Sequence, residues 1–248
     1  TDRDQLQVPG VGTLDEGTRL KSAIGLARFV HFMKIGPFIV DPQIIIPFGT
    51  IYGGKVNGQR LDKSSGIGDI VPFATIWFVN KPDPNHGTYL GFSPIVTFPT
   101  GNYKAGKSVN IGGNRMTYDM QVGLIQGLGK GLTLDVYGDV IWYGDNDKYG
   151  AARQTLSQNT TASLQLWGRA ALSPKTSVSL GYAGYWGGKQ KVDDLYNGNK
   201  TENQQIRVAL QTMVSKSIQL EGIAGRMVHV EGGFREAARF QIRVLKIF

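Results

Sequence analysis

The feature that most constrains the fold is an alternation of apolar and polar residues that recurs along most of the chain. In residues 132–142, every second side chain is apolar, and Thr133, Asp135, Tyr137 and Asp139 occupy the positions between. An extended strand places successive side chains on opposite faces, so this segment has one apolar and one polar face. The same alternation appears near residues 89–98, 163–169, 177–182, 205–211 and 239–244. The pattern predicts an all-β protein without helices.

Loop lengths distinguish a membrane barrel from a soluble sandwich, because a single alternating strand fits both. Short turns are expected near residues 127–131, 173–175 and 215–217. Long polar loops are expected between them, near residues 53–67, 101–113, 144–160 and 187–200. Outer-membrane barrels have short turns on one rim and long loops on the other. We therefore predict one transmembrane antiparallel β-barrel domain over residues 1–248, with a soluble β-sandwich binding protein as an alternative.

The strand count predicts a barrel of about twelve strands. Further strands are expected near residues 19–33, 37–52, 68–80, 114–126 and 217–230, which gives about eleven strands from Arg19 onward. Bacterial single-chain barrels have an even number of strands. Residues 1–17 contain Pro9, Gly10 and Gly12 and are typical of a loop, so we expect the first strand to precede the given sequence.

Several other classes of protein are disfavoured by composition. No stretch approaches the roughly 18 to 20 apolar residues of a membrane helix. The chain has no cysteine, which excludes disulfides, thiolate metal sites and cysteine nucleophiles. The net charge is +8 and the isoelectric point about 9.6, but the basic residues are spread singly, so we expect no nucleic-acid partner.

Both ends of the sequence favour export to the outer membrane of a Gram-negative bacterium. Residues 1–4 show no basic and apolar leader, so we expect that a signal peptide has been removed. The last strand runs to Phe248 and resembles the insertion signal of outer-membrane proteins. Lys246 breaks its apolar face, and we expect its ammonium to reach the headgroups. The expected partners are membrane lipid and lipopolysaccharide.

Four short motifs, taken in order, resemble the outer-membrane channel family associated with the meta pathway of phenol degradation. They are Gly66-Ile67-Gly68-Asp69, Pro99-Thr100-Gly101-Asn102-Tyr103, Asn110-Ile111-Gly112-Gly113-Asn114 and Trp142-Tyr143-Gly144-Asp145-Asn146. The resemblance implies a monomeric barrel of about twelve strands that admits small molecules, including hydrophobic or aromatic ones. The chain departs from that family in lacking an aromatic first strand and in having Gly113 where a basic residue is expected.

No cofactor or metal site is expected. His31, His86 and His229 are isolated from one another and from other metal ligands. The alternative function is an outer-membrane lipid hydrolase, but no Gly-x-Ser-x-Gly motif is present. The segment Gly66-Ile67-Gly68-Asp69 is followed by a strand rather than a helix, so we interpret it as a turn with Asp69 in the lumen and not as a phosphate loop.

Alternation predicts which side chains line the lumen, because a charge facing lipid at the bilayer midplane costs about 2 to 4 kcal/mol. The expected channel-lining residues are Asp69, Asp119, Asp135, Asp139, Tyr137, Trp167, Arg169, Arg207, Glu221, Arg239 and Arg243. The arginines predict a mild anion preference. Bulky side chains such as Tyr137 and Trp167 predict a narrow pore that suits small solutes.

Four prolines interrupt neighbouring strands and predict a kink in the barrel wall. Pro42, Pro47, Pro72 and Pro94 cannot donate to the strand ladder. The kink either shapes the wall or opens a lateral exit for hydrophobic solutes. The sequence leaves both interpretations open.

Overall fold

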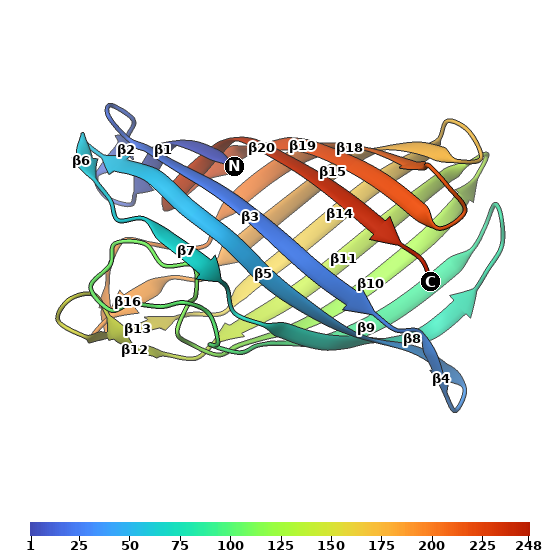
Figure 1. The fold of residues 1–248 in the computed structure, drawn as a ribbon, viewed down its shortest axis with the longest axis horizontal. Helices are drawn as coiled ribbons and strands as arrows, with labels where there is room; N and C mark the ends of the chain where they lie inside the picture. The colour runs from blue at the N-terminus through green and yellow to red at the C-terminus, as the bar shows by residue number, and fades with distance from the viewer.

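Twelve antiparallel strands form a closed barrel in the computed structural model, which describes all 248 residues (Figure 1). The barrel strands are β1 (Asp2–Val8), β3 (Arg19–Val30), β5 (Phe38–Val56), β8 (Val71–Lys81), β9 (Thr88–Thr97), β10 (Thr117–Gly129), β11 (Leu132–Tyr143), β14 (Thr161–Ala171), β15 (Thr176–Gly187), β18 (Asn203–Met213), β19 (Ile218–Val230) and β20 (Gly233–Lys246). No helix in the chain could cross a membrane. The predicted all-β class and the strand number are confirmed.

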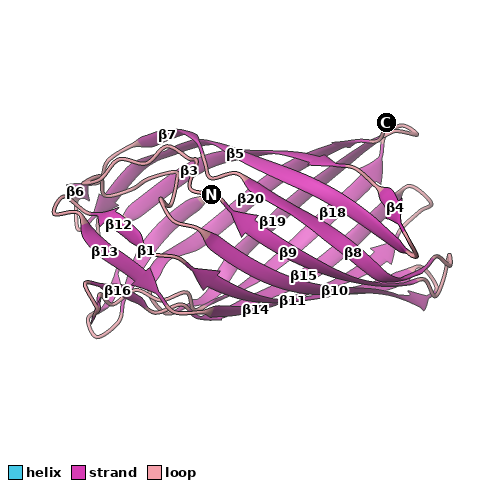
Figure 2. Cartoon of the chain, turned by 90° about the horizontal axis from the view of Figure 1, so that it is seen from below, coloured by secondary structure: helices cyan, strands magenta, loops and turns pink.

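Eight shorter strands lie in the connections, mostly at one end of the barrel (Figure 2). They are β2 (Gly12–Leu14), β4 (Met33–Ile35), β6 (Gln59–Arg60), β7 (Ser64–Ile67), β12 (Asn146–Tyr149), β13 (Gln154–Gln158), β16 (Gln190–Val192) and β17 (Leu195–Tyr196). Two long loops pair with each other, because β12, β13, β16 and β17 form a separate four-stranded sheet. The loop end of the barrel is therefore structured.

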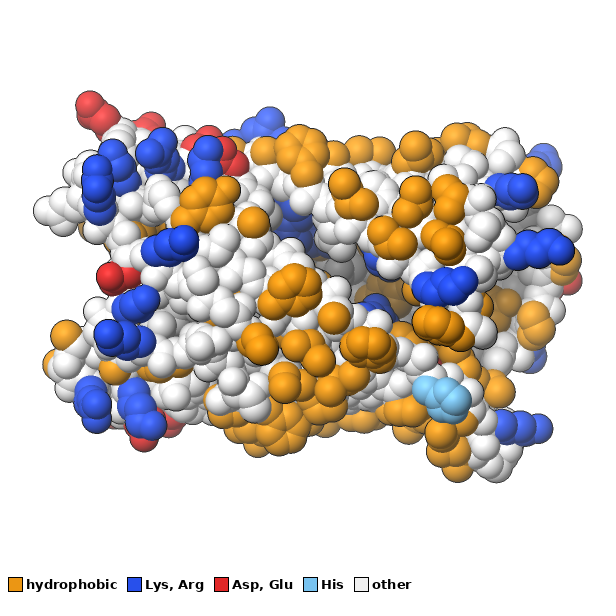
Figure 3. Space-filling view, viewed as in Figure 1, with side chains coloured by type: hydrophobic (Ala, Val, Ile, Leu, Met, Phe, Trp, Pro, Cys, Tyr) orange, Lys and Arg blue, Asp and Glu red, His pale blue; other side chains and the backbone are white.

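The barrel has an apolar outside and a polar inside, the reverse of a soluble sandwich. Its buried hydrophobic residues are only Leu20, Leu156, Ala183, Ala209 and Met227. Large apolar side chains instead cover the outer wall (Figure 3). Examples in the barrel strands are Leu134, Leu180, Val208, Phe240 and Ile242. This distribution is that of a protein whose wall faces lipid.

Short turns lie at one rim and most long loops at the other, as predicted (Figure 1). The connection between β19 and β20 is the exception, since only Glu231 and Gly232 join these strands at the loop end. Outward aromatic residues mark where the apolar band ends near the loops. They are Tyr52, Tyr118, Trp142 and Trp186, each partly exposed. Such belts lie at the interface between hydrocarbon and headgroups.

Residues 1–17 are not simply a loop, so that prediction is wrong. Asp2–Val8 form β1, which pairs with β20 through Leu6 and Phe234 and with β3 through Asp2 and Lys21. The alternation is hard to recognise because Asp2 pairs with Lys21 on the outer face, where other strands carry apolar residues, and because the register shifts on both sides of Arg3. Two backbone bonds join Thr1 and Ser22. Beyond them, the rest of β3 pairs only with β5, and β20 from Arg239 on pairs only with β19.

The four sequence motifs meet in one hydrogen-bonded cluster at the loop end. Both oxygens of the Asp69 carboxylate accept backbone N–H groups, from Gly101 at 2.8 Å and from Gly113 at 2.7 Å. Asn146 accepts a bond from the Asn114 amide at 2.7 Å and donates to the Tyr103 hydroxyl at 3.0 Å. Asp69 therefore holds loops together, and the prediction that it lines the lumen is corrected. Its carboxylate oxygens are occupied by backbone donors and are not presented to a solute.

The prolines differ in their effect on the wall. The β8–β9 register passes from Phe73↔Ile95 directly to Ile76↔Phe92, so the ladder is interrupted at Pro94. Next to Pro47, β5 changes its partner from β8 to β7. Pro42 and Pro72 lie instead within a continuous β5–β8 register, because a proline removes one donor and leaves its carbonyl free to pair. The irregular wall thus centres on Pro47 and Pro94.

Replacing Asp69 with Asn should loosen the loop cluster while leaving the barrel intact. One acceptor oxygen would become an NH₂ group facing a backbone N–H, and a lost bond to a charged acceptor costs about 1.5 to 3 kcal/mol. We expect faster hydrogen exchange at the Gly101 and Gly113 amides. Asp147→Asn is the matched control, because Asp147 is exposed on a neighbouring loop. Unchanged exchange in Asp69→Asn would contradict the anchoring role.

Candidate functional site: the charged lumen

Strand register places the remaining predicted lumen residues on the same face of the sheet. Asp135 lies opposite Trp167, Gly181 opposite Arg207, and Glu221 opposite Arg243. Chains of such pairs run from β10 to β20 and also include Asp119, Tyr137, Asp139, Arg169 and Arg239. The large exposed apolar side chains of these strands lie on the other face. This inner face is the candidate functional site.

Three groups of ion pairs bind neighbouring strands across the lumen wall. Arg169 contacts Asp135 at 2.6 Å, and Arg243 contacts Glu221 at 2.9 Å. Glu236 is almost fully buried and receives Arg3 at 3.0 Å and Arg239 at 2.9 Å. Arg3 belongs to β1 and Glu236 to β20, so this group also fastens the strand that closes the barrel.

Three further arginines are paired with neutral amides. Arg28 donates to the side-chain oxygen of Gln43 at 2.8 Å. The guanidinium of Arg207 donates to Gln205 at 2.6 Å, and that of Arg235 donates to Gln5 at 2.8 Å. An amide oxygen satisfies the donors without cancelling the charge. Arg28 and Arg207 therefore leave positive charge on the lumen face of β3 and β18. Arg235 directly precedes the inward Glu236 on β20, so strand alternation turns it to the other face.

Three lumen carboxylates have no cationic partner, and they lie on other strands. Asp41 on β5 accepts the Thr75 backbone N–H at 2.9 Å and the Trp77 indole N–H at 3.2 Å. On β11, Asp139 accepts bonds from the side chains of Gln121 and Ser163. Asp119 on β10 has one buried oxygen without any partner. In the strand order, β10 and β11 are three or more positions away from β18 and β3, so Asp119 and Asp139 are separated from the free guanidinium charges. Asp41 on β5 instead lies on the strand next to Arg28 of β3.

Side chains from opposite parts of the wall approach each other at the waist of the barrel. Tyr137 projects from β11, yet it is close enough to Arg28 of β3 and Arg243 of β20 to interact with them electrostatically. Arg28 likewise interacts with Arg243 and Asp41. A phenol ring and two guanidinium groups from different parts of the wall therefore project toward the same part of the lumen.

Inward aromatic rings pack against glycines on the adjacent strand. Tyr137 lies opposite Gly123, Trp167 opposite Gly181, and Trp77 opposite Gly91. A Cβ at Gly123 would come within 2.9 Å of the Tyr137 ring, and one at Gly181 within 2.5 Å of the Trp167 ring. The absence of a side chain at these positions lets each ring lie along the wall.

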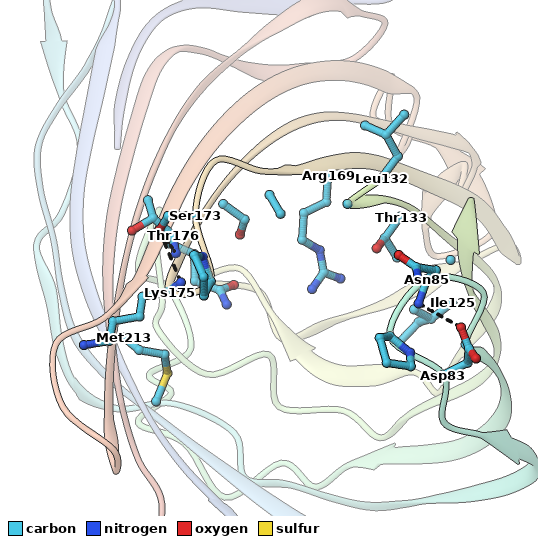
Figure 4. A pocket seen from close by; sticks show the side chains of 18 of the residues that line it. Asp83, Asn85, Ile125, Leu132, Thr133, Arg169, Ser173, Lys175, Thr176 and Met213 are labelled. Carbon is cyan, nitrogen blue, oxygen red and sulfur yellow. Dashed lines mark hydrogen bonds between the residues drawn. The ribbon is translucent and has the colours of Figure 1, made fainter. Parts of the chain in front are cut away.

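A cavity of about 380 Å³ opens at the short-turn end of the lumen. The Arg169 side chain points into it, while Asp83 and Lys175 lie at its margin (Figure 4). Backbone N–H groups of His86 and Asn85 bond the Asp83 carboxylate and hold the pKa of that group below its usual range. The mouth therefore presents fixed charges of both signs.

Comparison with known proteins gives two findings. A family model described as "Putative MetA-pathway of phenol degradation" matches residues 3–244. The chain belongs to this family. It is also similar to the crystal structure of the COG4313 outer membrane channel from Pseudomonas putida F1, with 29% identity and a TM-score of 0.92 over 100% of this chain and 91% of that chain. No curated protein matches the chain.

These findings confirm the resemblance inferred from the four motifs and the fold of an outer-membrane channel. An outer-membrane location fits both the closed barrel and the similarity to this channel.

Several lumen residues of this family member were missed from sequence. Arg3 and Glu236 were overlooked because the strand that they fasten was read as a loop. Asp41 and Gln43 were overlooked because Pro42 separates them, although they alternate with Val40 and Ile44 in the expected way. The regular alternation of polar residues on β5 could have identified this last pair.

Replacing Gly123 with Ala should narrow the channel. The new methyl group would push the Tyr137 ring away from the wall, and such overpacking typically destabilises by about 1 to 3 kcal/mol. We expect a lower single-channel conductance. Gly138→Ala is the matched control, because Gly138 lies on the outer face opposite Val122, where an added Cβ has no neighbour within 4 Å. The double change Gly123→Ala with Tyr137→Ala should restore conductance, and failure to do so would refute the packing argument.

Proposed function

We propose that this protein is a passive channel in the outer membrane of a Gram-negative bacterium, and that it carries small solutes through a narrow, charged lumen. The supporting observation is the charged inner face of a twelve-strand barrel, which leads into the cavity at the short-turn mouth. Barrels of eight strands are filled by side chains and those of sixteen contain open pores, so twelve strands suit a restricted passage. In this proposal it works as a monomer, surrounded by membrane lipid and lipopolysaccharide.

Hydrophobic or aromatic solutes suit this lumen better than sugars. Strand alternation puts Ile24, Leu26 and Val30 on the same inward face of β3 as Arg28. The rings of Trp77, Tyr137 and Trp167 provide flat apolar surfaces on other strands. The family description, which refers to phenol degradation, supports the same class of solute.

Exposure of the unneutralised charges supports a mild anion preference. Asp41 and Asp139 are 3% and 6% exposed, so mobile ions have little access to their carboxylates. Arg28 is exposed, and Arg207 is partly exposed. Ions in the lumen therefore meet guanidinium groups more readily than carboxylates.

The lipid-hydrolase alternative receives no support from the histidines. A serine hydrolase needs a histidine ring hydrogen-bonded to its serine. No hydrogen bond joins the ring of His31, His86 or His229 to a serine or threonine hydroxyl. The only ion-pair geometry of a histidine is that of His229 with Glu231, at 3.4 Å. A non-enzymatic role therefore fits best.

Charge substitutions of opposite sign should move the ion selectivity in opposite directions. Arg207→Gln removes an accessible positive charge and should shift the reversal potential toward cation preference in a salt gradient. Asp119→Asn should increase anion preference. Lys216→Gln, on an exposed turn at the barrel end, is a control for net charge. Cation selectivity in the unmodified protein would reject the proposed preference.

Solute size and chemistry provide a separate test of transport. In liposome swelling, we expect phenol and benzoate to pass faster than a disaccharide, because Tyr137, Arg28 and Arg243 narrow the waist. Tyr137→Ala should raise the disaccharide rate more than the phenol rate. Equal rates for all three solutes in the unmodified protein would contradict a narrow pore.

A further inference from the structure

An unusual row of like charges crosses three adjacent strands on the outer wall. Arg19 of β3 lies directly opposite Lys55 of β5, and Lys55 lies directly opposite Arg60 of β6. Like charges at directly opposed positions destabilise a sheet. None of the three side chains takes part in an ion pair, and Asp15 and Glu16 on the nearby loop do not pair with them either. The folded chain thus leaves their repulsion uncompensated.

The local backbone is shaped to bring these cations together. Gly53 has a φ of +63°, a conformation that favours glycine, and the β3–β5 register shifts between Arg19 and Lys21. This irregularity aligns Lys55 with Arg19. Gly54 faces inward, toward Leu20 and Leu61, so the cationic row lies on the outer face.

A hollow of about 290 Å³ is lined by this row. Its six lining residues are Arg19, Gly53, Gly54, Lys55, Arg60 and Leu61, none of which is acidic. In Figure 3, basic side chains gather at the loop end over β6 and the end of β5. The hollow can therefore receive an anionic group that contacts several cations at once.

The row stands at the level of the outer headgroups. Tyr52, an outward aromatic residue of the belt, lies opposite Lys21 just below it, and Lys21 is already paired with Asp2 at 3.6 Å. Phe48 continues the same outer face into the apolar band. An anion at this level belongs to a lipid whose acyl chains lie against that band.

We propose that Arg19, Lys55 and Arg60 form a binding site for a phosphate group of a glycolipid in the outer leaflet, of the lipid A type. Arginine and lysine are the usual ligands of phosphate oxygens, and arginine can bind two of them at once. The bound phosphate supplies the negative charge that the three side chains lack. The site lies on the outer wall and does not depend on the proposed transport function.

Native mass spectrometry of the detergent-solubilised protein tests the site. The probes are diphosphorylated lipid A, the same lipid without phosphates, and inorganic phosphate. We expect one lipid A molecule to bind in a phosphate-dependent manner. The triple variant Arg19→Ala, Lys55→Ala and Arg60→Ala should bind it roughly 100-fold more weakly, since each cation near an anionic surface contributes about a fivefold step. The control removes three cations at the other rim, with Lys34→Ala, Lys81→Ala and Lys216→Ala, and should bind as the unmodified protein does.

Two outcomes would overturn the proposal. Equal binding of dephosphorylated lipid A would remove the role of the phosphate. Inorganic phosphate that binds as tightly as lipid A would indicate a free-phosphate site and not a lipid site.

Stability supplies a second readout that a purely structural role would not produce. Without lipid A, Lys55→Gln should unfold at the same or a higher denaturant concentration, because it relieves repulsion. Added lipid A should stabilise the unmodified protein more than this variant. The proposal would also be overturned if Lys55→Gln were less stable than the unmodified protein without lipid A, and if added lipid A stabilised both proteins equally.

Discussion

Pairing of backbone hydrogen-bond groups is the constraint on which the rest of this structure depends. In hydrocarbon an unpaired N–H or C=O group costs several kcal/mol, so strands can cross only as a sheet closed on itself. Here closure rests on β1, which has seven residues, of which only Leu6 and Val8 are apolar. Apolar contact with lipid contributes little to holding such a strand. Its position is fixed by polar side chains, since Arg3 reaches Glu236 and Gln5 accepts a bond from Arg235.

The same inner face must therefore stabilise the wall and present a surface to solutes. Carboxylates that receive arginines join adjacent strands, as Glu221 and Glu236 do. Arginines bound to glutamine oxygens, such as Arg28 and Arg207, are positioned equally firmly but keep their charge. An arginine paired with a carboxylate therefore mainly stabilises the barrel wall, whereas an arginine paired with an amide also acts on ions in the lumen. The net charge of the protein does not reveal this difference.

Alternation predicted the fold well because lipid imposes it on every strand that it touches. It identified β11, β14, β18 and β20 with their lumen residues, since one face of each strand is apolar almost throughout. The prediction failed for strands whose sequence pattern is not determined mainly by contact with lipid. β1 is held by polar contacts, and the alternation of β5 is hidden by prolines. The role of Asp69 depends on Gly101 and Gly113, which are 32 and 44 residues away in the chain. Such long-range partners cannot be read from local spacing.

The basic residues of this barrel differ according to the solvent that surrounds them. Inside, these arginines are held by a carboxylate or an amide oxygen of the barrel wall, from the same or a neighbouring strand, because the protein must satisfy its own interior. At the outer rim, Arg19, Lys55 and Arg60 face one another without such a partner, at a point where the β3–β5 register is irregular. A sheet tolerates this arrangement when the surrounding medium supplies the missing anion. The charges at this part of the outer wall are then balanced only when the lipid that contacts it supplies an anionic group.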